Sequence, residues 1–178
     1  MQSTVLITGA SSGIGRACAE ILAKHNYNLI LLGKDNDALQ ESVINCRLLD
    51  HTITVSGYCL DITSKDEVNN FFESQKLTTD HVNILINCAG VAGGVNDLLD
   101  GNFENSETVI NTNLTALVHI TQKIIPSLLA QKSGHIVNLG SIAGRWVYSK
   151  AAVYCATKFA VRAFGEGLRQ DLLGTSRS

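Results

Sequence analysis

A tyrosine and a lysine stand four residues apart near the end of the sequence, in the segment Tyr-Cys-Ala-Thr-Lys from Tyr154 to Lys158. On a helix, residues i and i+4 lie on the same face, so these two side chains would be neighbours. The positive charge of a lysine stabilises an adjacent phenolate, which would make Tyr154 suitable for proton transfer in catalysis. By themselves, two such residues are more often an ordinary surface pair, and the rest of the sequence has to decide between the two interpretations.

A glycine-rich segment, Thr-Gly-Ala-Ser-Ser-Gly-Ile-Gly from Thr8 to Gly15, follows an apolar run and precedes a helical pattern. Glycines there permit a tight turn and let a pyrophosphate approach the backbone, while the helix N-terminus supplies free N–H groups and partial positive charge. The spacing is GxxxGxG rather than GxGxxG, so the glycines alone would be weak support. Between a strand and a helix, however, the segment favours nucleotide binding over a purely structural turn.

The end of the second predicted strand favours NADP over NAD. An NAD enzyme usually has an acidic residue here, about 20 residues past the glycine loop, which binds the ribose 2′-hydroxyl. Gly33 occupies that place and Lys34 follows it, and a cation suits a 2′-phosphate. Ser11 and Ser12 could donate to the same phosphate. Asp35 leaves NAD possible because it could accept from a ribose or pair with Lys34, and a solvated lysine at a strand end is the alternative without function.

Two further strand ends have residues suited to a flat cofactor. Asp61, in Cys-Leu-Asp-Ile, could accept from an adenine amino group, or it could be a polar loop residue or a cap for the helix that begins near Ser64. The segment Asn-Cys-Ala-Gly, from Asn87 to Gly90, has small residues that let a cofactor pass close to the backbone. Asn87 could instead tie neighbouring strand ends together, and the two roles are compatible.

A serine follows the fifth predicted strand, in Asn-Leu-Gly-Ser-Ile-Ala-Gly from Asn138 to Gly144. Ser141 does not fit the nucleophile of a hydrolase, because the Gly-x-Ser-x-Gly elbow and a suitably placed histidine are both missing. A hydroxyl that donates a hydrogen bond to a carbonyl fits better. Strand end, loop and helix start could bring the hydroxyls of Ser141 and Tyr154 together. Asn113 is another candidate, although an asparagine within a helix more often faces solvent or caps a turn.

Alternating strands and helices position these residues. Buried strands are predicted by apolar runs at 4–8, 28–32, 53–60, 82–86 and 135–139. Helical spacing of apolar residues predicts helices at 14–25, 36–48, 106–131 and 151–173, with one more that begins near Ser64. We expect Ser64 as N-cap with Glu67 closing a capping box, and a bend caused by Pro126. The pattern predicts an α/β fold, a three-layer doubly wound parallel sheet (Rossmann-like) that binds ligands beyond the carboxyl ends of its strands.

Composition and charge narrow the class of protein. The chain has 178 residues, enough for one domain (1–178), and its 45% apolar and 17% charged residues exclude a disordered chain. A formal charge of −2 argues against nucleic acid as the main partner. The five cysteines and five histidines form no CxxC, HxxxH or Cys/His cluster, so we expect reduced thiols and no metal site. We find no signal peptide and no apolar run that could span a membrane, which indicates a soluble, cytoplasmic protein.

Together these segments resemble the short-chain dehydrogenase/reductase family over residues 4–173. The resemblance rests on the loop from Thr8 to Gly15, Asp61, Asn87-Cys88-Ala89-Gly90, Asn113, Ser141 and the segment from Tyr154 to Lys158, in this order. A narrower likeness, to the branch of NADP-dependent 3-hydroxy acid dehydrogenases similar to serine and L-allo-threonine dehydrogenases, rests on Asn138–Gly144, Trp146, Tyr148, Val153-Tyr154, Ala156-Thr157-Lys158 and Leu168-Arg169-x-Asp171-Leu172.

The resemblance implies an oxidoreductase that transfers a hydride between NADP(H) and a small hydroxy or keto substrate, with a 3-hydroxy acid expected. Tyr154 would be the general acid/base, and Lys158 would stabilise its phenolate and hold the nicotinamide ribose. Ser141 would orient the substrate carbonyl, and Asn113 would support a water or a backbone bend. Trp146 and Tyr148 could line the substrate pocket or serve only in packing. The cofactor contacts expected are Gly9, Ser11, Ser12, Gly13, Ile14, Gly15, Lys34, Asp61, Ile62, Asn87, Ala89, Gly90, Tyr154 and Lys158.

The sequence departs from the family pattern in two places. The usual second asparagine after the fourth strand is Cys88. Family members also continue with further strands, a Pro-Gly turn and a substrate-covering helical segment, so we expect the sequence to be incomplete, without the C-terminal strands. A homo-oligomer, a tetramer or dimer built on 106–131 and 151–173, is expected from the family. A 3-oxoacyl thioester or other ketone as substrate, a non-catalytic NADP-binding module, and a pure scaffold remain as alternatives, of which the last fits the residues least.

Overall fold

A computed structural model describes residues 2–93, 102–131 and 133–175 of the chain. The chain folds into two compact units, which we call the sheet unit and the helical unit. The sheet unit comprises Met1–Ala89 and Ala116–Leu139, and the helical unit comprises Gly90–Thr115 and Gly140–Ser178.

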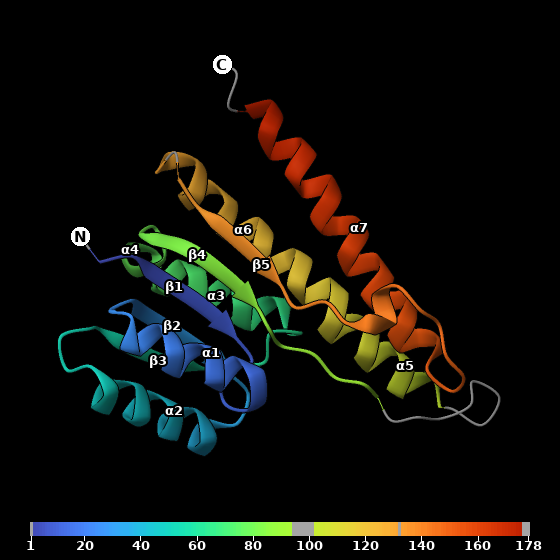
Figure 1. The fold of residues 1–178 in the computed structure, drawn as a ribbon, viewed down its shortest axis with the longest axis horizontal. Helices are drawn as coiled ribbons and strands as arrows, with labels where there is room; N and C mark the ends of the chain where they lie inside the picture. The colour runs from blue at the N-terminus through green and yellow to red at the C-terminus, as the bar shows by residue number, and fades with distance from the viewer. Residues whose placement is uncertain (1, 94–101, 132, 176–178) are drawn as a thin grey trace. The chain divides into compact units, whose positions relative to one another are not determined.

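The sheet unit is built on a five-stranded, fully parallel sheet with the strand order β3-β2-β1-β4-β5 (Figure 1). The strands are β1 (Thr4–Thr8), β2 (Asn28–Gly33), β3 (Val55–Cys59), β4 (Val82–Asn87) and β5 (His135–Asn138). All five predicted strands are confirmed, each within two residues of its expected ends. β3 and β5 form the two edges, and the described residues contain no further strand.

Successive residues of β1 point to opposite faces of the sheet and enter two separate cores. Val5 and Ile7 belong to one buried cluster, while Leu6 between them belongs to the other. Because both faces are buried at β1 and β2, these central strands are apolar at consecutive positions rather than at alternate ones. This is why continuous apolar runs in the sequence predicted these two strands correctly.

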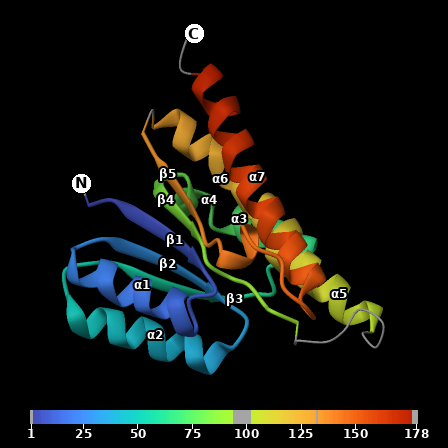
Figure 2. The same cartoon turned by 45° about the vertical axis from the view of Figure 1, so that its right-hand side comes forward.

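Helices cover both faces of the sheet. One face is covered by α1 (Gly13–Lys24) and α2 (Asn36–Leu49), and the other by α3 (Lys65–Ser74) and α6 (Ala116–Ala130), as Figure 2 shows. This confirms the predicted three-layer, doubly wound α/β fold. A short helix, α4 (Lys76–Thr79), was not predicted, and α6 continues as an α-helix past Pro126 to Ala130.

The helical unit contains α5 (Phe103–Ile110), a π-helical turn η1 (Asn111–Thr115), a 3₁₀ turn η2 (Ile142–Gly144) and α7 (Ala152–Thr175). The long helix α7 packs against α5, η1 and η2. The helical stretch predicted over 106–131 is confirmed as far as Ala130, but in its middle η1 is a π-helical turn between α5 and α6. Such turns are rare and often occur at functional sites.

The capping box predicted for α3 forms only in part. The Ser64 hydroxyl accepts from the Glu67 N–H at 3.3 Å, as expected for an N-cap. The Glu67 carboxylate, however, accepts from the N–H of Asp61 at 2.8 Å and not from that of Ser64. The Glu67 carboxylate thus links α3 to the loop after β3 and does not cap the first residue of the helix. None of the described helices is long and apolar enough to cross a membrane.

Candidate active site

The glycine loop between β1 and α1 is held in a conformation that depends on glycine. Gly9 has φ +68°, and a Cβ on it would lie 2.8 Å from the Cα of Ala89. A Cβ on Gly15 would lie 2.2 Å from the carbonyl oxygen of Gly9, so the start of α1 packs directly on the loop. Gly13 has φ +51°, and no atom of the described residues lies within 4 Å of the position its Cβ would take. The loop therefore combines tight backbone packing with open space at its helix end.

The N-terminus of α1 has donors suited to an anion. Ser12 is its N-cap residue in an extended conformation, and the Ser12 hydroxyl makes no capping hydrogen bond to the helix. The first-turn N–H groups consequently have no side-chain acceptor from that cap, and they have the partial positive charge of a helix N-terminus. Ile14, also in this first turn, is 57% exposed. The backbone conformation of the loop, its N–H donors and the free space beside it all suit the phosphates of a dinucleotide.

The carboxyl ends of β1, β4 and β5 are joined by side-chain hydrogen bonds. The Thr8 hydroxyl accepts from the N–H groups of Cys88 and Ala89, both at 3.1 Å. The buried Asn87 amide donates to Thr121 and to Asn138, both at 2.9 Å. The predicted tying role of Asn87 is therefore present. No donor among the described residues reaches the Asn87 Oδ1, which is buried.

At the ends of β2 and β3, Lys34 forms an ion pair with Asp61, with 2.7 Å between Nζ and Oδ2. The hydrogen bond from Lys34 lowers the pKa of Asp61 to about 2, and Thr63 contributes with two further donors. The same contact raises the pKa of Lys34. Asp35, which we considered as a partner for Lys34, instead caps α2 by accepting from the Ala38 N–H at 3.1 Å.

Two predictions about the loop after β3 have definite outcomes. Asp61 is not the N-cap of α3, because Ser64 takes that role. Ile62, predicted as a cofactor contact, is partly buried against the core cluster that also contains Leu60. Its side chain thus has a packing role in this loop.

Asn113 is the centre of a hydrogen-bonded cluster in the helical unit. Its side chain is 1% exposed, and it lies in the π turn η1. Its Oδ1 accepts from the Val91 N–H at 2.8 Å, and its Nδ2 donates to the Val91 carbonyl at 2.9 Å and to Thr157 Oγ1 at 3.2 Å. Asn113 therefore neither faces solvent nor caps a helix, the two commoner alternatives. It fastens the segment at Val91 to η1 and α7.

Tyr154 and Lys158 lie together on α7, as their spacing predicted. The Lys158 Nζ is 5.8 Å from the centroid of the Tyr154 ring, within the range of a cation–π contact. Lys158 is only 6% exposed, so the pair is not an ordinary surface pair. A Cβ on Gly90 would lie 3.7 Å from Nζ and 3.2 Å from the Oδ1 of Asn113. Gly90 thus gives the ammonium and the amide room beside the backbone.

Ser141 is held against the same helix through η2. Its hydroxyl accepts from the Ala143 N–H at 3.1 Å, which makes Ser141 the N-cap of this turn. A Cβ on Gly144 would lie 2.7 Å from the carbonyl oxygen of Lys158, so η2 packs directly on the α7 backbone. The helical unit therefore contains all four residues that we predicted as catalytic: Asn113, Ser141, Tyr154 and Lys158.

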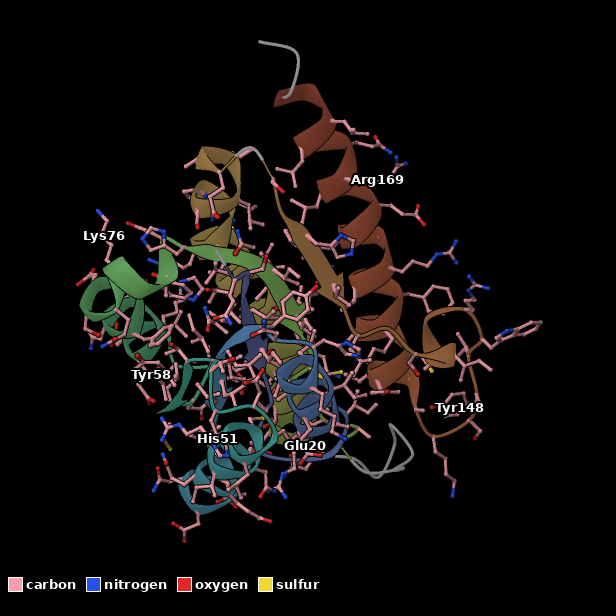
Figure 3. The ribbon with its side chains drawn as sticks, turned by 60° about the vertical axis from the view of Figure 1, so that its left-hand side comes forward. Glu20, His51, Tyr58, Lys76, Tyr148 and Arg169 are labelled. Carbon is pink, nitrogen blue, oxygen red and sulfur yellow. The ribbon has the colours of Figure 1, made fainter. Side chains whose placement is uncertain are left out.

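The two predicted substrate residues lie on the loop between η2 and α7. Trp146 is 69% exposed and Tyr148 is 47% exposed. Tyr148 is labelled on this loop in Figure 3. Neither side chain therefore belongs to the buried core among the described residues of the helical unit, and both the pocket role and the packing role stay predictions.

Sequence reasoning missed three threonine hydroxyls that hydrogen-bond to residues of the site, those of Thr8, Thr121 and Thr157. It also missed Arg16 of α1. A polar residue that ends an apolar strand, as Thr8 does, is a usable signal, because a buried hydroxyl needs a partner. The three threonines are at most 3% exposed. Their partners lie far away in the sequence, so the pattern alone could not name them.

A parallel sheet with helices on both faces and a glycine loop at the end of β1 defines a dinucleotide-binding α/β protein of the Rossmann type. The chain belongs to the short chain dehydrogenase family, whose family model matches residues 3–176. It is accordingly an oxidoreductase of the short-chain dehydrogenase/reductase type.

Individual proteins support the same assignment. The NADP-dependent 3-hydroxy acid dehydrogenase YdfG of Escherichia coli K12 is 34% identical over 172 residues, which are 97% of this chain and 67% of that protein. An uncharacterised oxidoreductase of Staphylococcus saprophyticus is 35% identical over 171 residues, 96% of this chain and 72% of that protein.

Solved structures with the same fold include two dehydrogenases. Serine dehydrogenase from Escherichia coli superposes with a TM-score of 0.85 at 32% identity, over 95% of this chain and 76% of that one. NAD⁺-bound xylitol dehydrogenase superposes with a TM-score of 0.90 at 27% identity, over 97% of this chain and 65% of that one. The chain spans between 65% and 76% of the length of these four relatives.

Proposed function

We propose that the protein transfers a hydride between NADP(H) and a small hydroxy or keto substrate, with a 3-hydroxy acid as the substrate class. The observation that supports this best is the Tyr154–Lys158 pair, in which a nearly buried ammonium lies 5.8 Å from the phenol ring. Burial of a cation is costly, and its position beside an ionisable hydroxyl is a pattern of functional sites. Relatives named for NADP-dependent 3-hydroxy acid dehydrogenation and for serine dehydrogenation support the substrate class.

Tyr154 is the general acid/base of this proposal. In the direction of oxidation its phenolate takes the proton of the substrate hydroxyl, and in the direction of reduction its phenol returns that proton to the developing alkoxide. Lys158 stabilises the phenolate by its charge. Ser141 donates a hydrogen bond to the substrate oxygen and so orients the carbon that gains or loses the hydride.

Asn113 has a supporting part. Its amide holds both backbone polar groups of Val91, and its Oδ1 lies beside the space above Gly90 that the Lys158 ammonium also borders. We propose that the π turn and this amide keep the backbone bend open, so that a water can link Lys158 to solvent. The expected effect is proton exchange between the Tyr154–Lys158 pair and bulk water.

NADP(H), when bound, supplies or accepts the hydride. The residues that would hold it are those of the glycine loop and the strand ends: Gly9, Ser11, Ser12, Gly13, Ile14, Gly15, Lys34, Asp61, Ile62, Asn87, Ala89 and Gly90, with Tyr154 and Lys158 at the ribose. Lys34 is 80% exposed in its side chain and can turn toward a 2′-phosphate. Asp61, its present partner, remains for the adenine amino group. The acid that would favour NAD is absent at Gly33.

A coupled assay tests this function. Purified protein should reduce NADP⁺ with L-serine, L-allo-threonine or 3-hydroxybutyrate, and reduce NAD⁺ more slowly. Tyr154→Phe should abolish turnover while NADPH still binds, whereas Tyr27→Phe, which removes a phenol hydroxyl in the sheet unit, should leave turnover unchanged. NADPH binding with no turnover on any hydroxy acid, 3-oxoacyl thioester or ketone would instead support a non-catalytic binding module. Retained turnover in Tyr154→Phe would refute the mechanism.

We further propose that residues 1–178 act as one dinucleotide-binding domain in the cytoplasm and assemble as a homo-oligomer, a tetramer or dimer, through the helices at 106–131 and 151–173. The support is family membership. Light scattering coupled to size-exclusion chromatography measures the mass directly, and a monomer at micromolar concentration would contradict the assembly.

A further inference from the structure

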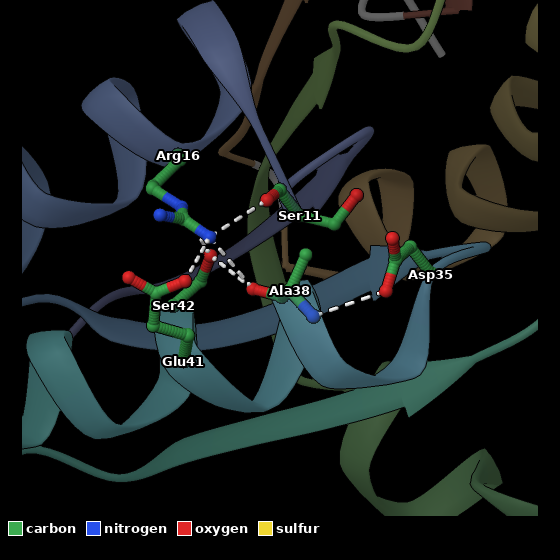
Figure 4. Close-up of polar contacts among 6 residues, drawn as sticks. All are labelled: Ser11, Arg16, Asp35, Ala38, Glu41 and Ser42. Atoms are coloured by element: carbon green, nitrogen blue, oxygen red, sulfur yellow. Dashed lines mark hydrogen bonds and ion pairs between the residues drawn. The ribbon is translucent and has the colours of Figure 1, made fainter.

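Arg16, in the first turns of α1, links the glycine loop to α2. Its Nε donates to the Ser42 hydroxyl at 2.9 Å, and its Nη2 donates to the carbonyl oxygens of Ser11 and Ala38 and to the Glu41 carboxylate, each at 3.0 Å (Figure 4). Four acceptors from two segments of the chain thus converge on one guanidinium. All of these residues lie within the sheet unit.

An ion pair with Glu41 does not account for this arrangement. The Glu41 side chain is 61% exposed, and pairs at such exposure contribute little. The Arg16 side chain is only 24% exposed, and Ser42 is fully buried. The guanidinium therefore also donates to a buried hydroxyl and to two partly buried carbonyl oxygens, of which the Ser11 carbonyl is the one in the glycine loop. A planar group with several donors in fixed directions is needed for this, and lysine cannot replace it.

The hydrogen bond to Ser11 sets the orientation of a peptide group. In a trans peptide the carbonyl and the following N–H point in opposite directions. Because the Ser11 carbonyl points to Arg16 and α2, the N–H of Ser12 points away from them. A rotation of this peptide group would turn the Ser12 N–H toward α2 and break the hydrogen bond between the Ser11 carbonyl and Arg16.

The side chain of Ser11 lies beside the end of β2. A Cβ on Gly33, the last residue of β2, would lie 3.0 Å from the Ser11 Cβ and 3.2 Å from its hydroxyl oxygen. The Ser11 hydroxyl thus lies over the strand end where an NAD enzyme would have an acid for the ribose 2′-hydroxyl. Lys34 is the next residue. A hydroxyl and a cation at this place suit a 2′-phosphate.

We propose that Arg16 is a positioning residue for cofactor selectivity: by holding the Ser11 carbonyl, it orients the Ser11 hydroxyl and the Ser12 N–H toward the 2′-phosphate of NADP(H). This inference rests on the proposed function. Arg16 acts in this proposal through Ser11, since its Nε and Nη2 donate to protein acceptors. Its loss therefore weakens NADPH binding and leaves NADH binding nearly unchanged, since NADH has no 2′-phosphate.

The test measures dissociation constants of NADPH and NADH by fluorescence titration of the full chain. In Arg16→Lys the Kd of NADPH should rise about tenfold, the effect of losing one hydrogen bond at the upper end of the usual range, while the Kd of NADH changes less than about twofold. Ser11→Ala should shift the ratio of the two constants in the same direction. The ratio of the two constants in the double variant should equal that in the more affected single variant, because both substitutions remove the same interaction with the 2′-phosphate.

Glu41→Gln is the matched control, since it removes the negative charge of the exposed partner of Arg16 without touching Ser11. Its ratio of the NADPH and NADH dissociation constants should equal that of the wild type. An equal rise of both constants in Arg16→Lys would show a merely structural role and overturn the inference, as would an unchanged ratio in Ser11→Ala, which does not depend on the folding of the arginine variant. A wild-type protein that binds neither nucleotide would overturn the proposed function itself.

Discussion

Replacement of Asn113 by alanine tests whether the buried amide holds the helical unit together. The change removes three hydrogen bonds, two to the Val91 backbone and one to Thr157. At about 0.5–1.5 kcal/mol each, these bonds would contribute roughly 1.5–4.5 kcal/mol. Val91 is 39% exposed, so water can replace Asn113 at its backbone groups and reduce the loss. We therefore expect the free energy of unfolding to fall by about 2 kcal/mol.

The measurement is urea unfolding followed by circular dichroism, together with the thermal midpoint. A loss of about 2 kcal/mol corresponds to a fall in Tm of about 4–8 °C for a chain of this size. Thr157→Val, which keeps the branched shape and removes only the hydroxyl, should cost about 1 kcal/mol. Asn70→Ala is the matched control, because Asn70 is exposed within α3 and no contact there depends on its amide.

The reasoning fails if Asn113→Ala and Asn70→Ala have the same free energy of unfolding to within about 0.5 kcal/mol. Such a result would mean that the amide of Asn113 exchanges its partners for water without cost. A large loss in Thr157→Val with none in Asn113→Ala would instead assign the stabilisation to the bond between the Thr157 hydroxyl and the Tyr154 carbonyl, which measures 2.8 Å.

Three further predictions follow from single residues. Gly15→Ala should lower the free energy of unfolding by about 2 kcal/mol or more, because its Cβ would lie 2.2 Å from a backbone carbonyl oxygen, whereas Gly140→Ala, with nothing within 4 Å, should be nearly neutral in the same urea titration. The pKa of Asp61 is lowered to about 2, so the stabilisation by this carboxylate is present above its unfolded-state pKa and is lost as the pH falls toward 2. Between about pH 5 and pH 2 the free energy of unfolding of the wild type should fall by about 1 kcal/mol more than that of Asp61→Asn. The figure is modest because Lys34 is mostly exposed. Burial raises the pKa of the Cys46 thiol to about 11, so a thiol reagent at pH 8 should modify the exposed Cys59 in the folded protein and reach Cys46 only after unfolding, and equal rates would contradict this assignment.

The fold could be predicted because each element has a local signal. Five apolar runs gave the five strands, and burial on both faces explains why the runs of β1 and β2 are continuous. The π turn at Asn111–Thr115 gave no such signal, since its residues are compatible with a helix. The contact made from this turn is tertiary: the Asn113 amide pairs with the backbone of Val91, and that partner lies in another segment.

The candidate site was predictable where a residue acts with its neighbours in sequence. The spacing of Tyr154 and Lys158 placed both on one helix face, and the structure has them there. The bond from Glu67 to Asp61 in place of the expected capping box, and the pairing of Lys34 with Asp61 rather than Asp35, could not be foreseen. In each case several acceptors lie within reach along the chain, and only the path of the loop decides which one is used.

The cysteine at position 88 illustrates how the strand ends tolerate a departure from the family pattern. Where the family usually has a second asparagine, Cys88 contributes its backbone N–H to the Thr8 hydroxyl, and Ala89 does the same. Any residue except proline at position 88 can supply that donor, so replacing an amide by a thiol leaves this bond intact. The side chains that make the hydrogen bonds are instead those of Thr8 and Asn87. The Thr8 hydroxyl, in a residue that is 2% exposed, accepts two hydrogen bonds, and the Asn87 amide donates to Asn138 on the neighbouring strand. The register of the strand ends, and with it the placing of the glycine loop against Ala89, therefore depends on a threonine and one asparagine rather than on an asparagine pair.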